Sequence, residues 1–157
     1  MKLLIADDDP IILDLLAEIF VAYGFDDIVL TSNGAEALQA IEASPKPFDY
    51  LLLDVQMPVM DGITLCREVR REPGYANTPI IMITAMTDKA HIDAAFLAGA
   101  TDYTTKPFDV RMLISQVRRA EQPAAVLPTK RVLSAANSPD FADPALLERK
   151  ISGFVGQ

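Results

Sequence analysis

The sequence predicts an α/β fold with one open, doubly wound parallel sheet, and two features of residues 1 to 121 lead to this prediction. Short apolar runs alternate with segments of helical periodicity, at the repeat length of strand and helix units. Three of these runs, LLIA, YLLLD and PIIMIT, are apolar at consecutive positions, which is typical of parallel strands buried on both faces. For five such strands we expect the common order 2-1-3-4-5, with helices on both faces of the sheet.

Each predicted element is justified in turn by its local sequence. The five expected strands are Lys2–Ala6, Asp27–Thr31, Tyr50–Asp54, Pro79–Thr84 and Asp102–Thr105. Residues with known preferences for helix ends are Pro10 and Gly24 for the first helix, Asn33 for the second, Asp88 for the fourth and Asp109 for the fifth. The third helix follows Gly62 and is expected to be short, because Pro73 and Gly74 end it early.

The composition excludes several classes of protein. Of 157 residues, 50% are hydrophobic, so the chain can bury a core and is not disordered throughout. No uncharged apolar run is long enough for a membrane span, and the N-terminus reaches Asp7 too soon for a signal peptide, so a cytoplasmic protein without membrane association is predicted. Because Cys66 is the one cysteine and His91 the one histidine, an internal disulfide and a Cys/His zinc cage are excluded.

The charge divides the chain into two parts. Residues 1–121 hold 10 basic and 19 acidic side chains, whereas residues 122–157 hold 4 and 3. The acidic balance repels phosphate backbones, so direct binding of nucleic acid is not expected. The second part carries four prolines and no sustained apolar strand, which predicts a linker or C-terminal arm. Within it, residues 144–154 form either a short helix or a frayed tail.

Polar residues stand at the carboxyl ends of the predicted strands. Asp7 and Asp8 follow the first strand, Asp54 ends the third, Thr84 ends the fourth and Lys106 follows the fifth. In the expected strand order the first and third strands are neighbours at the reversal point, where ligands bind in such sheets. The three carboxylates should therefore converge, and their mutual repulsion requires a raised pKa or a cation. Hard oxygen ligands of this kind suit Mg²⁺.

A carboxylate in such a cluster can act as a nucleophile and form an aspartyl phosphate. The reaction needs groups that neutralise the phosphoryl charge. A lysine supplies a positive charge and a hydroxyl supplies a hydrogen bond, and Lys106 and Thr84 fit these two roles.

These residues lie in motifs that resemble the receiver (CheY-like) domain of two-component response regulators, which has a flavodoxin-like fold. The matching stretches are LLIADDDP, LLLDVQMPVMDG, PIIMITA and GATDYTTKPF, in that order. The resemblance covers residues 1–121. It implies that Asp54 is the phosphoacceptor, that Asp8 binds Mg²⁺ directly and Asp7 largely through water, and that the backbone carbonyl of Gln56 completes the protein ligands.

The resemblance also implies how the site switches. Lys106 and Thr84 would contact the phosphoryl group, and Tyr103 would be the switch aromatic, moving into space that Thr84 vacates. The side chains of Gln56 and Met86 stand where the family modulates autodephosphorylation. The implied function is a switch for signal transduction, not a conventional enzyme, with Mg²⁺-dependent phosphorylation and autodephosphorylation at Asp54.

The implied partners are a sensor histidine kinase or a histidine phosphotransfer protein. By resemblance, the donor would dock on the first helix, at Ile11, Asp14, Leu15 and Glu18. The fourth and fifth helices carry opposite charges that could pair in a homodimer through the fourth helix, fifth strand and fifth helix. Those residues are Asp88, Lys89 and Asp93 on one helix and Arg111, Arg118 and Arg119 on the other. Ordinary solvated helix faces would look the same.

Two other functions are weighed. A phosphohydrolase resembling the haloacid dehalogenase group would use Asp7 and Asp9 as nucleophile and acid, but it lacks a later acidic pair and leaves Asp54 idle. A degenerate receiver would act only as a binding module. An EF-hand at Asp54 to Asp61 fails because Pro58 stands where a ligand is needed. No effector motif is recognised after residue 121. The chain is either a stand-alone receiver or a piece of a longer regulator, and we favour the stand-alone receiver.

Some polar residues are expected to be structural. Asp9 should cap the first helix, and Asp61 with Gly62 should form a turn. Cys66 is expected to pack in the core, and His91 to be a surface helix residue.

Overall fold

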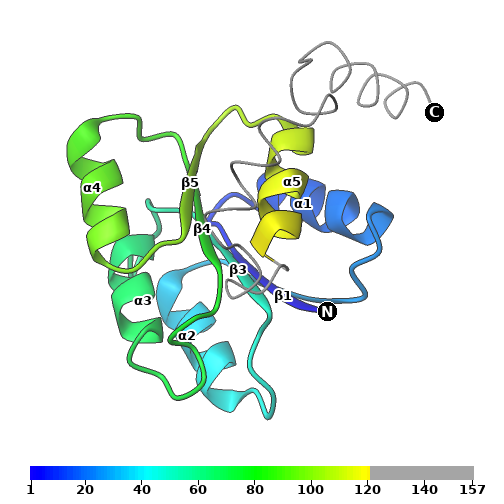
Figure 1. Cartoon of the computed structure of the whole chain (residues 1–157), viewed down its shortest axis with the longest axis horizontal. Coiled ribbons are helices and arrows are strands. Elements are labelled where there is room, and N and C mark those ends of the chain that lie inside the picture. Colours follow the sequence, from blue (N-terminus) through cyan, green and yellow to red (C-terminus); the bar gives the residue numbers. More distant parts are fainter. Residues whose placement is uncertain (121–157) are drawn as a thin grey trace, which may run out of the picture. The chain divides into compact units, whose positions relative to one another are not determined.

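The computed structural model describes residues 1–120, in which five strands alternate with five helices (Figure 1). The strands are β1 (Lys2–Ala6), β2 (Asp27–Thr31), β3 (Tyr50–Leu53), β4 (Ile80–Thr84) and β5 (Asp102–Thr105). The helices are α1 (Pro10–Ala22), α2 (Gly34–Ala43), α3 (Gly62–Val69), α4 (Lys89–Leu97) and α5 (Val110–Ala120). The predicted alternation is confirmed. The expected arm at 122–157, with its helix at 144–154, lies outside the described residues.

All neighbouring strands are parallel, in the order β2-β1-β3-β4-β5, as predicted. The last residue of β1, Ala6, pairs with Thr31 on one side and with Leu53 on the other. The strand order therefore reverses next to β1, and the residues that follow β1 and β3 emerge side by side at the carboxyl edge of the sheet.

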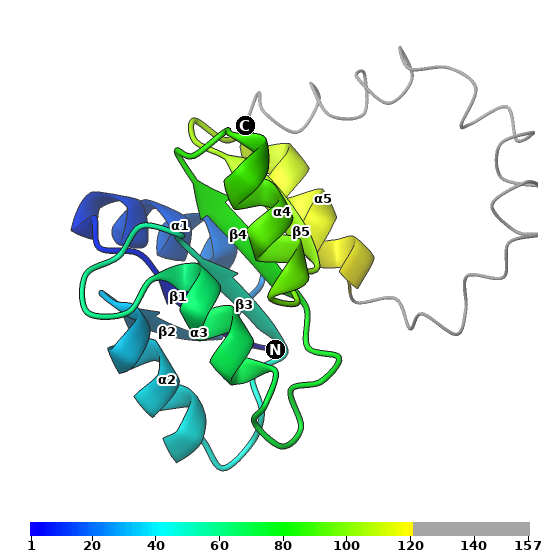
Figure 2. The ribbon, with the colours of Figure 1, turned by 90° about the vertical axis from the view of Figure 1, so that its left-hand side faces the viewer.

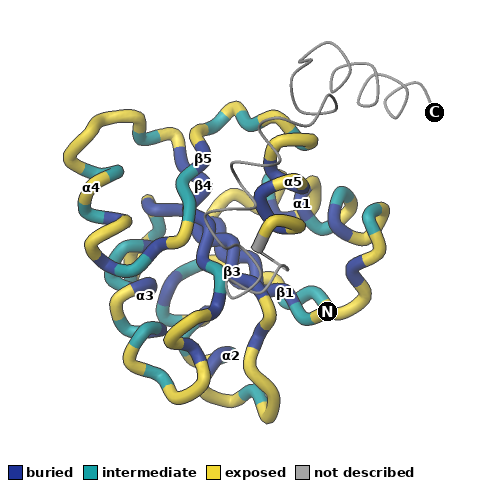
Figure 3. Tube along the Cα trace, viewed as in Figure 1, coloured by how far each residue is buried: buried dark blue, intermediate teal, exposed yellow. Residues whose placement is uncertain are grey.

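The sheet lies between two layers of helices. Helices α1 and α5 lie on one side, and α2, α3 and α4 lie on the other (Figures 1 and 2). Every residue of β3 and β4 is buried, whereas exposed residues gather on the outer helix faces (Figure 3). This burial explains why the central strands read as continuous apolar runs. In the described part of the chain, no helix has the length and apolar character needed to cross a bilayer.

Side-chain caps fix the helix starts. Asp9, Asn33, Asp61 and Asp88 each accept a hydrogen bond from a backbone N–H in the first turn of α1, α2, α3 and α4. The caps at Asp9, Asn33 and Asp88 agree with the predictions, while Asp61, interpreted as a turn residue, also caps a helix. Strand β4 begins after Pro79, which has no N–H to donate to a neighbouring strand.

Candidate functional site

The carboxylates of Asp7, Asp8 and Asp54 meet at the carboxyl edge of the sheet. Asp54 follows β3 directly, and its backbone N–H still donates to the Ala6 carbonyl of β1, at 2.8 Å. One carboxylate oxygen from each of the three residues lies within 4.8 Å of the other two. Asp7 and Asp54 are buried, with 2% and 6% of their surface exposed, whereas Asp8 is exposed. The convergence expected from the strand order is thus observed.

The loop after β3 is held close to this cluster by Gly62. A Cβ atom at Gly62 would clash with the backbone carbonyl of Asp54, so only glycine allows this approach. The Gly62 N–H donates to the Val55 carbonyl at 2.9 Å, and the Gln56 N–H lies 3.4 Å from Oδ1 of Asp54. The backbone of Gln56 is therefore next to the acidic cluster, while its side chain is exposed.

Lys106 approaches the cluster from the end of β5. Its ammonium donates to Oδ2 of Asp7 at 2.6 Å and lies 3.5 Å from Oδ2 of Asp54. Its backbone N–H donates to the Thr84 carbonyl at 2.8 Å, which ties this residue to the end of β4. The peptide bond between Lys106 and Pro107 is cis. One cation thus bridges two buried carboxylates that come from different strands.

Lys106 only partly offsets the negative charges of Asp7 and Asp54. Burial raises the pKa of the Asp54 carboxyl, the negative charge of Asp7 raises it further, and Lys106 offsets only part of this rise. For Lys106, burial lowers the pKa, but the hydrogen bond to Asp7 and the charges of both carboxylates outweigh it, so its pKa is raised. A further cation beside Asp54 would therefore stabilise its ionised carboxylate.

Thr84 and Tyr103 connect the cluster to the loop between β4 and α4. Thr84 is fully buried, and its hydroxyl accepts a hydrogen bond from the Met86 N–H at 3.3 Å. The Tyr103 hydroxyl donates to the Met86 carbonyl at 2.5 Å. Burial raises the pKa of the Tyr103 hydroxyl, with smaller contributions from the charges of Asp88 and Asp54. Thr84 and Tyr103 therefore both form hydrogen bonds with the backbone of Met86.

A groove of about 800 Å³ opens beside the cluster, between the loop after β3 and helix α4. Its lining includes Asp8, Gln56, Met86 and His91. The sequence interpretation missed His91, which is half-buried here and whose Nδ1 lies 2.6 Å from Asp88. The three-residue spacing of Asp88 and His91 on one helix was the available signal.

The donor set fits a hard divalent cation. Three carboxylates offer oxygen atoms within 4.8 Å of one another, and this charge is only partly offset by Lys106. Oxygen ligands of this type, with open positions for water, are those that Mg²⁺ prefers.

The sequence and the structure were compared with known proteins. A family model described as the response regulator receiver domain matches residues 3–118. The DNA-binding response regulator MtrA of Mycolicibacterium smegmatis is 36% identical over 132 residues, which are 80% of this chain and 55% of MtrA. The chain spans about half the length of the curated relatives that it matches.

Two solved structures agree with this match. The receiver domain of a Francisella response regulator is 33% identical, with a TM-score of 0.68, covering 76% of this chain and 94% of that one. A receiver domain from a Pseudomonas aeruginosa sensor histidine kinase is 27% identical, with a TM-score of 0.68, covering 75% of this chain and 94% of that one. That structure is described with a magnesium ion coordinated in its active site cleft.

The dehalogenase-like alternative finds no support in these comparisons. In the structure, Asp9 caps α1 and its N–H donates to Asp7, while Asp54 is a member of the carboxylate cluster and Asp9 is not. The fold, the order of the motifs and the matched residues agree, and the chain belongs to the response regulator receiver domain family.

Proposed function

We propose that Asp54 accepts a phosphoryl group from the phosphohistidine of a sensor histidine kinase or phosphotransfer protein, and that the aspartyl phosphate switches the chain between two conformations. The observation that carries this proposal is the arrangement of buried Asp54 beside Asp7, Asp8 and the ammonium of Lys106. A nucleophile, a cation and a set of metal ligands thus meet at the point where the strand order reverses.

The transfer is a substitution at phosphorus. One carboxylate oxygen of Asp54 forms the new bond to phosphorus, and the bond from phosphorus to the imidazole nitrogen of the donor breaks. Asp8, Asp54, the Gln56 carbonyl and, through water, Asp7 would hold Mg²⁺, which when bound neutralises charge on the carboxylates and phosphoryl oxygens. Lys106 lies close enough to Asp54 to donate to a phosphoryl oxygen there.

The switch would run through Thr84 and Tyr103. A phosphoryl group on Asp54 adds acceptor oxygens, and these favour a conformation in which the Thr84 hydroxyl turns toward them. The Thr84 hydroxyl now accepts from the Met86 N–H, so this bond would be given up and the loop before α4 would move. Tyr103 already holds the Met86 carbonyl, and it would carry this movement to β5.

The lifetime of the phosphoryl group would depend on residues at the mouth of the site. Gln56 is exposed and Met86 is half-buried, and both line the groove beside the cluster. We expect exchange of either side chain to change the rate of autodephosphorylation, because they control how water reaches phosphorus.

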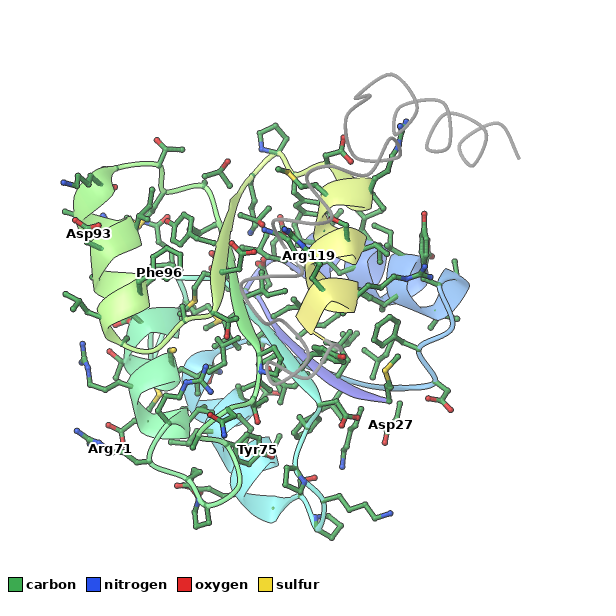
Figure 4. The ribbon with its side chains drawn as sticks, viewed as in Figure 1. Asp27, Arg71, Tyr75, Asp93, Phe96 and Arg119 are labelled. Atoms are coloured by element: carbon green, nitrogen blue, oxygen red, sulfur yellow. The ribbon has the colours of Figure 1, made fainter. Side chains whose placement is uncertain are left out.

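The proposed partners would bind to exposed surfaces on α1, α4 and α5. On α1, Ile11 and Leu15 are apolar and exposed, by 75% and 44%, and Asp14 and Glu18 are exposed beside them. This face is the proposed docking surface for the phosphodonor. Asp93 lies on the side of α4 that faces away from the sheet (Figure 4), and Arg111 is exposed on α5, so these opposite charges could pair across a homodimer. Measuring the oligomeric state with and without beryllofluoride, a mimic of the phosphoryl group, tests the proposed dimer surface on α4 and α5.

The test of the phosphoacceptor uses acetyl phosphate with Mg²⁺. We expect one phosphoryl group per chain in the unaltered protein and none in Asp54→Ala. Asp27→Ala is the control, because Asp27 is exposed at the start of β2, away from the carboxyl edge. Labelling that persists in Asp54→Ala would contradict the proposal, and continuous hydrolysis of a phosphomonoester would favour a phosphohydrolase.

A further inference from the structure

Arg70 at the end of α3 makes an unusual set of contacts. Its guanidinium donates to the Gly99 carbonyl twice, at 3.0 and 2.7 Å, and to the carbonyls of Tyr75 and Thr78, each at 2.7 Å. It also lies 3.5 Å from the Thr101 hydroxyl. Burial lowers the pKa of Arg70, and no carboxylate pairs with it among the contacts found in residues 1–120. The guanidinium therefore binds mainly backbone carbonyls, with one longer contact to a hydroxyl.

The two hydrogen bonds to Gly99 tie Arg70 to the C-terminal end of α4. The helix closes there with the Gly99 N–H donating to the Phe96 carbonyl and the Ala100 N–H donating to the Ala95 carbonyl, the pattern of a Schellman motif. Gly99 has a φ of 109°, and a Cβ atom there would lie 2.8 Å from Cγ of Arg70. Arg70 thus fills the space that a side chain at this position would need.

The N-terminal end of α4 has no comparable attachment among the described residues. Asp88, Lys89 and Ala90 are exposed, and the cap consists of exposed Asp88 and its pairing with half-buried His91. Ala95 is the one fully buried residue of this helix, and it lies in the C-terminal half. The two ends of α4 therefore differ. The C-terminal end is bound through Gly99 to Arg70, which also binds the carbonyls of Tyr75 and Thr78, whereas the N-terminal end is held by its own cap.

We propose that Arg70 is a positioning residue that makes the C-terminal end of α4 a fixed pivot for the switch. Movement of the loop at Met86 then tilts the N-terminal half of α4, while Phe96 and Leu97 at the other end keep their place. This inference rests on the proposed function, because it concerns where the movement triggered at Asp54 stops. It predicts that partners distinguish the two states by residues near Lys89 and Asp93.

Amide hydrogen exchange on the full chain tests the pivot, with Mg²⁺ and beryllofluoride as the mimic of a phosphoryl group. In the unaltered protein we expect exchange rates to change by about tenfold at residues 86–92 and to stay the same at residues 95–101. A change of equal size along the whole helix, or one confined to 95–101, would overturn the proposal.

Arg70→Met and Arg70→Lys provide the second measurement. Met keeps the apolar stem without the guanidinium, and we expect the beryllofluoride response to spread into residues 95–101. Lys restores one donor head and should reduce this spread. Arg71→Met is the matched control, since Arg71 is exposed, pairs with Glu68 of α3 and points outward (Figure 4).

The outcomes separate the pivot from the function on which it rests. A response in Arg70→Met that still ends before residue 95 overturns the pivot, and if neither Arg70 variant folds, the pattern in the unaltered protein decides. Failure of acetyl phosphate to label Asp54 ends the proposed function and the pivot together. Labelling of Asp54 with a uniform response along α4 ends the pivot alone.

Discussion

The two edges of the sheet each hold a half-buried cation, but the groups that surround the two cations differ. At the carboxyl edge Lys106 faces Asp7 and Asp54, two carboxylates that repel each other and are not fully neutralised. At the amino edge of β4 and β5 the Arg70 guanidinium is surrounded by neutral carbonyls that it satisfies. The first arrangement favours binding of further charge, and the second favours the fold as it stands.

The comparison also extends to the backbone. At the carboxyl edge Val59 has a φ of 69°, and the Met60 N–H donates to the Pro58 carbonyl at 2.8 Å, which closes a strained three-residue turn. At the amino edge the residue with positive φ that Arg70 contacts is a glycine, Gly99, for which this conformation is inexpensive. Substitutions at the two edges should therefore change stability in opposite directions.

The largest expected effect is at the amino edge. Arg70→Ala leaves the carbonyls of Gly99, Tyr75 and Thr78 without this donor, and we expect a loss of about 3 kcal/mol in the free energy of unfolding. Arg71→Ala should change it by less than about 0.5 kcal/mol, because that side chain is exposed. Urea denaturation measures both. Equal effects of the two substitutions would show that the amino edge is not a structural clamp.

At the carboxyl edge we expect a substitution to raise the free energy of unfolding instead of lowering it. Asp54→Asn removes a charge that burial and the neighbouring charge of Asp7 disfavour, as its raised pKa indicates, so the variant should be more stable by about 1 kcal/mol near neutral pH. Because the folded-state pKa is above the ordinary 3.8, the folded protein takes up the proton first as the pH falls. The advantage of the variant should therefore shrink as the pH falls through the raised pKa.

The same substitution in a Lys106→Met variant tests the electrostatic cause of this effect. Lys106 offsets part of the repulsion, so Asp54→Asn should stabilise a Lys106→Met variant more than it stabilises the unaltered protein. Urea unfolding at about pH 7 and about pH 4 gives the stability of all four proteins at each pH. A loss of stability on Asp54→Asn at neutral pH is the result that would contradict the electrostatic description of the site.

The smallest expected effect is at Val59. Glycine adopts positive φ without the steric cost that a β-branched residue meets, so Val59→Gly should raise the free energy of unfolding by about 0.5 to 1 kcal/mol. Val21→Gly is the control, because Val21 is exposed on α1 and glycine lowers stability in a helix by a similar amount. A decrease for both variants would mean that the loop after β3 stores no strain.

Much of the fold could be predicted from the sequence because it depends on local patterns. Consecutive apolar residues mark buried strands, caps mark helix starts, and the strand order is the common one for five parallel strands of this kind. The cluster of Asp7, Asp8 and Asp54 could be expected for the same reason, since carboxyl ends of parallel strands share one edge.

Contacts between side chains and distant carbonyls could not be predicted. Every residue has a carbonyl, so the sequence carries no signal that Arg70 binds Gly99 or that Tyr103 binds Met86. The cap at Asp61 was missed because Asp followed by Gly also marks a turn, and only the bond to the Thr64 N–H distinguishes the two. Spacing shows which residues can meet, and long-range packing decides what they bind.

The central claim is that Asp54 is the residue that becomes phosphorylated. Treatment with acetyl phosphate and Mg²⁺ followed by borohydride reduces an aspartyl phosphate to homoserine, which peptide mass spectrometry locates in the chain. We predict homoserine at position 54 and unchanged aspartate at positions 7, 8 and 9. Homoserine at position 7, or unchanged aspartate at all four positions, would contradict the assignment.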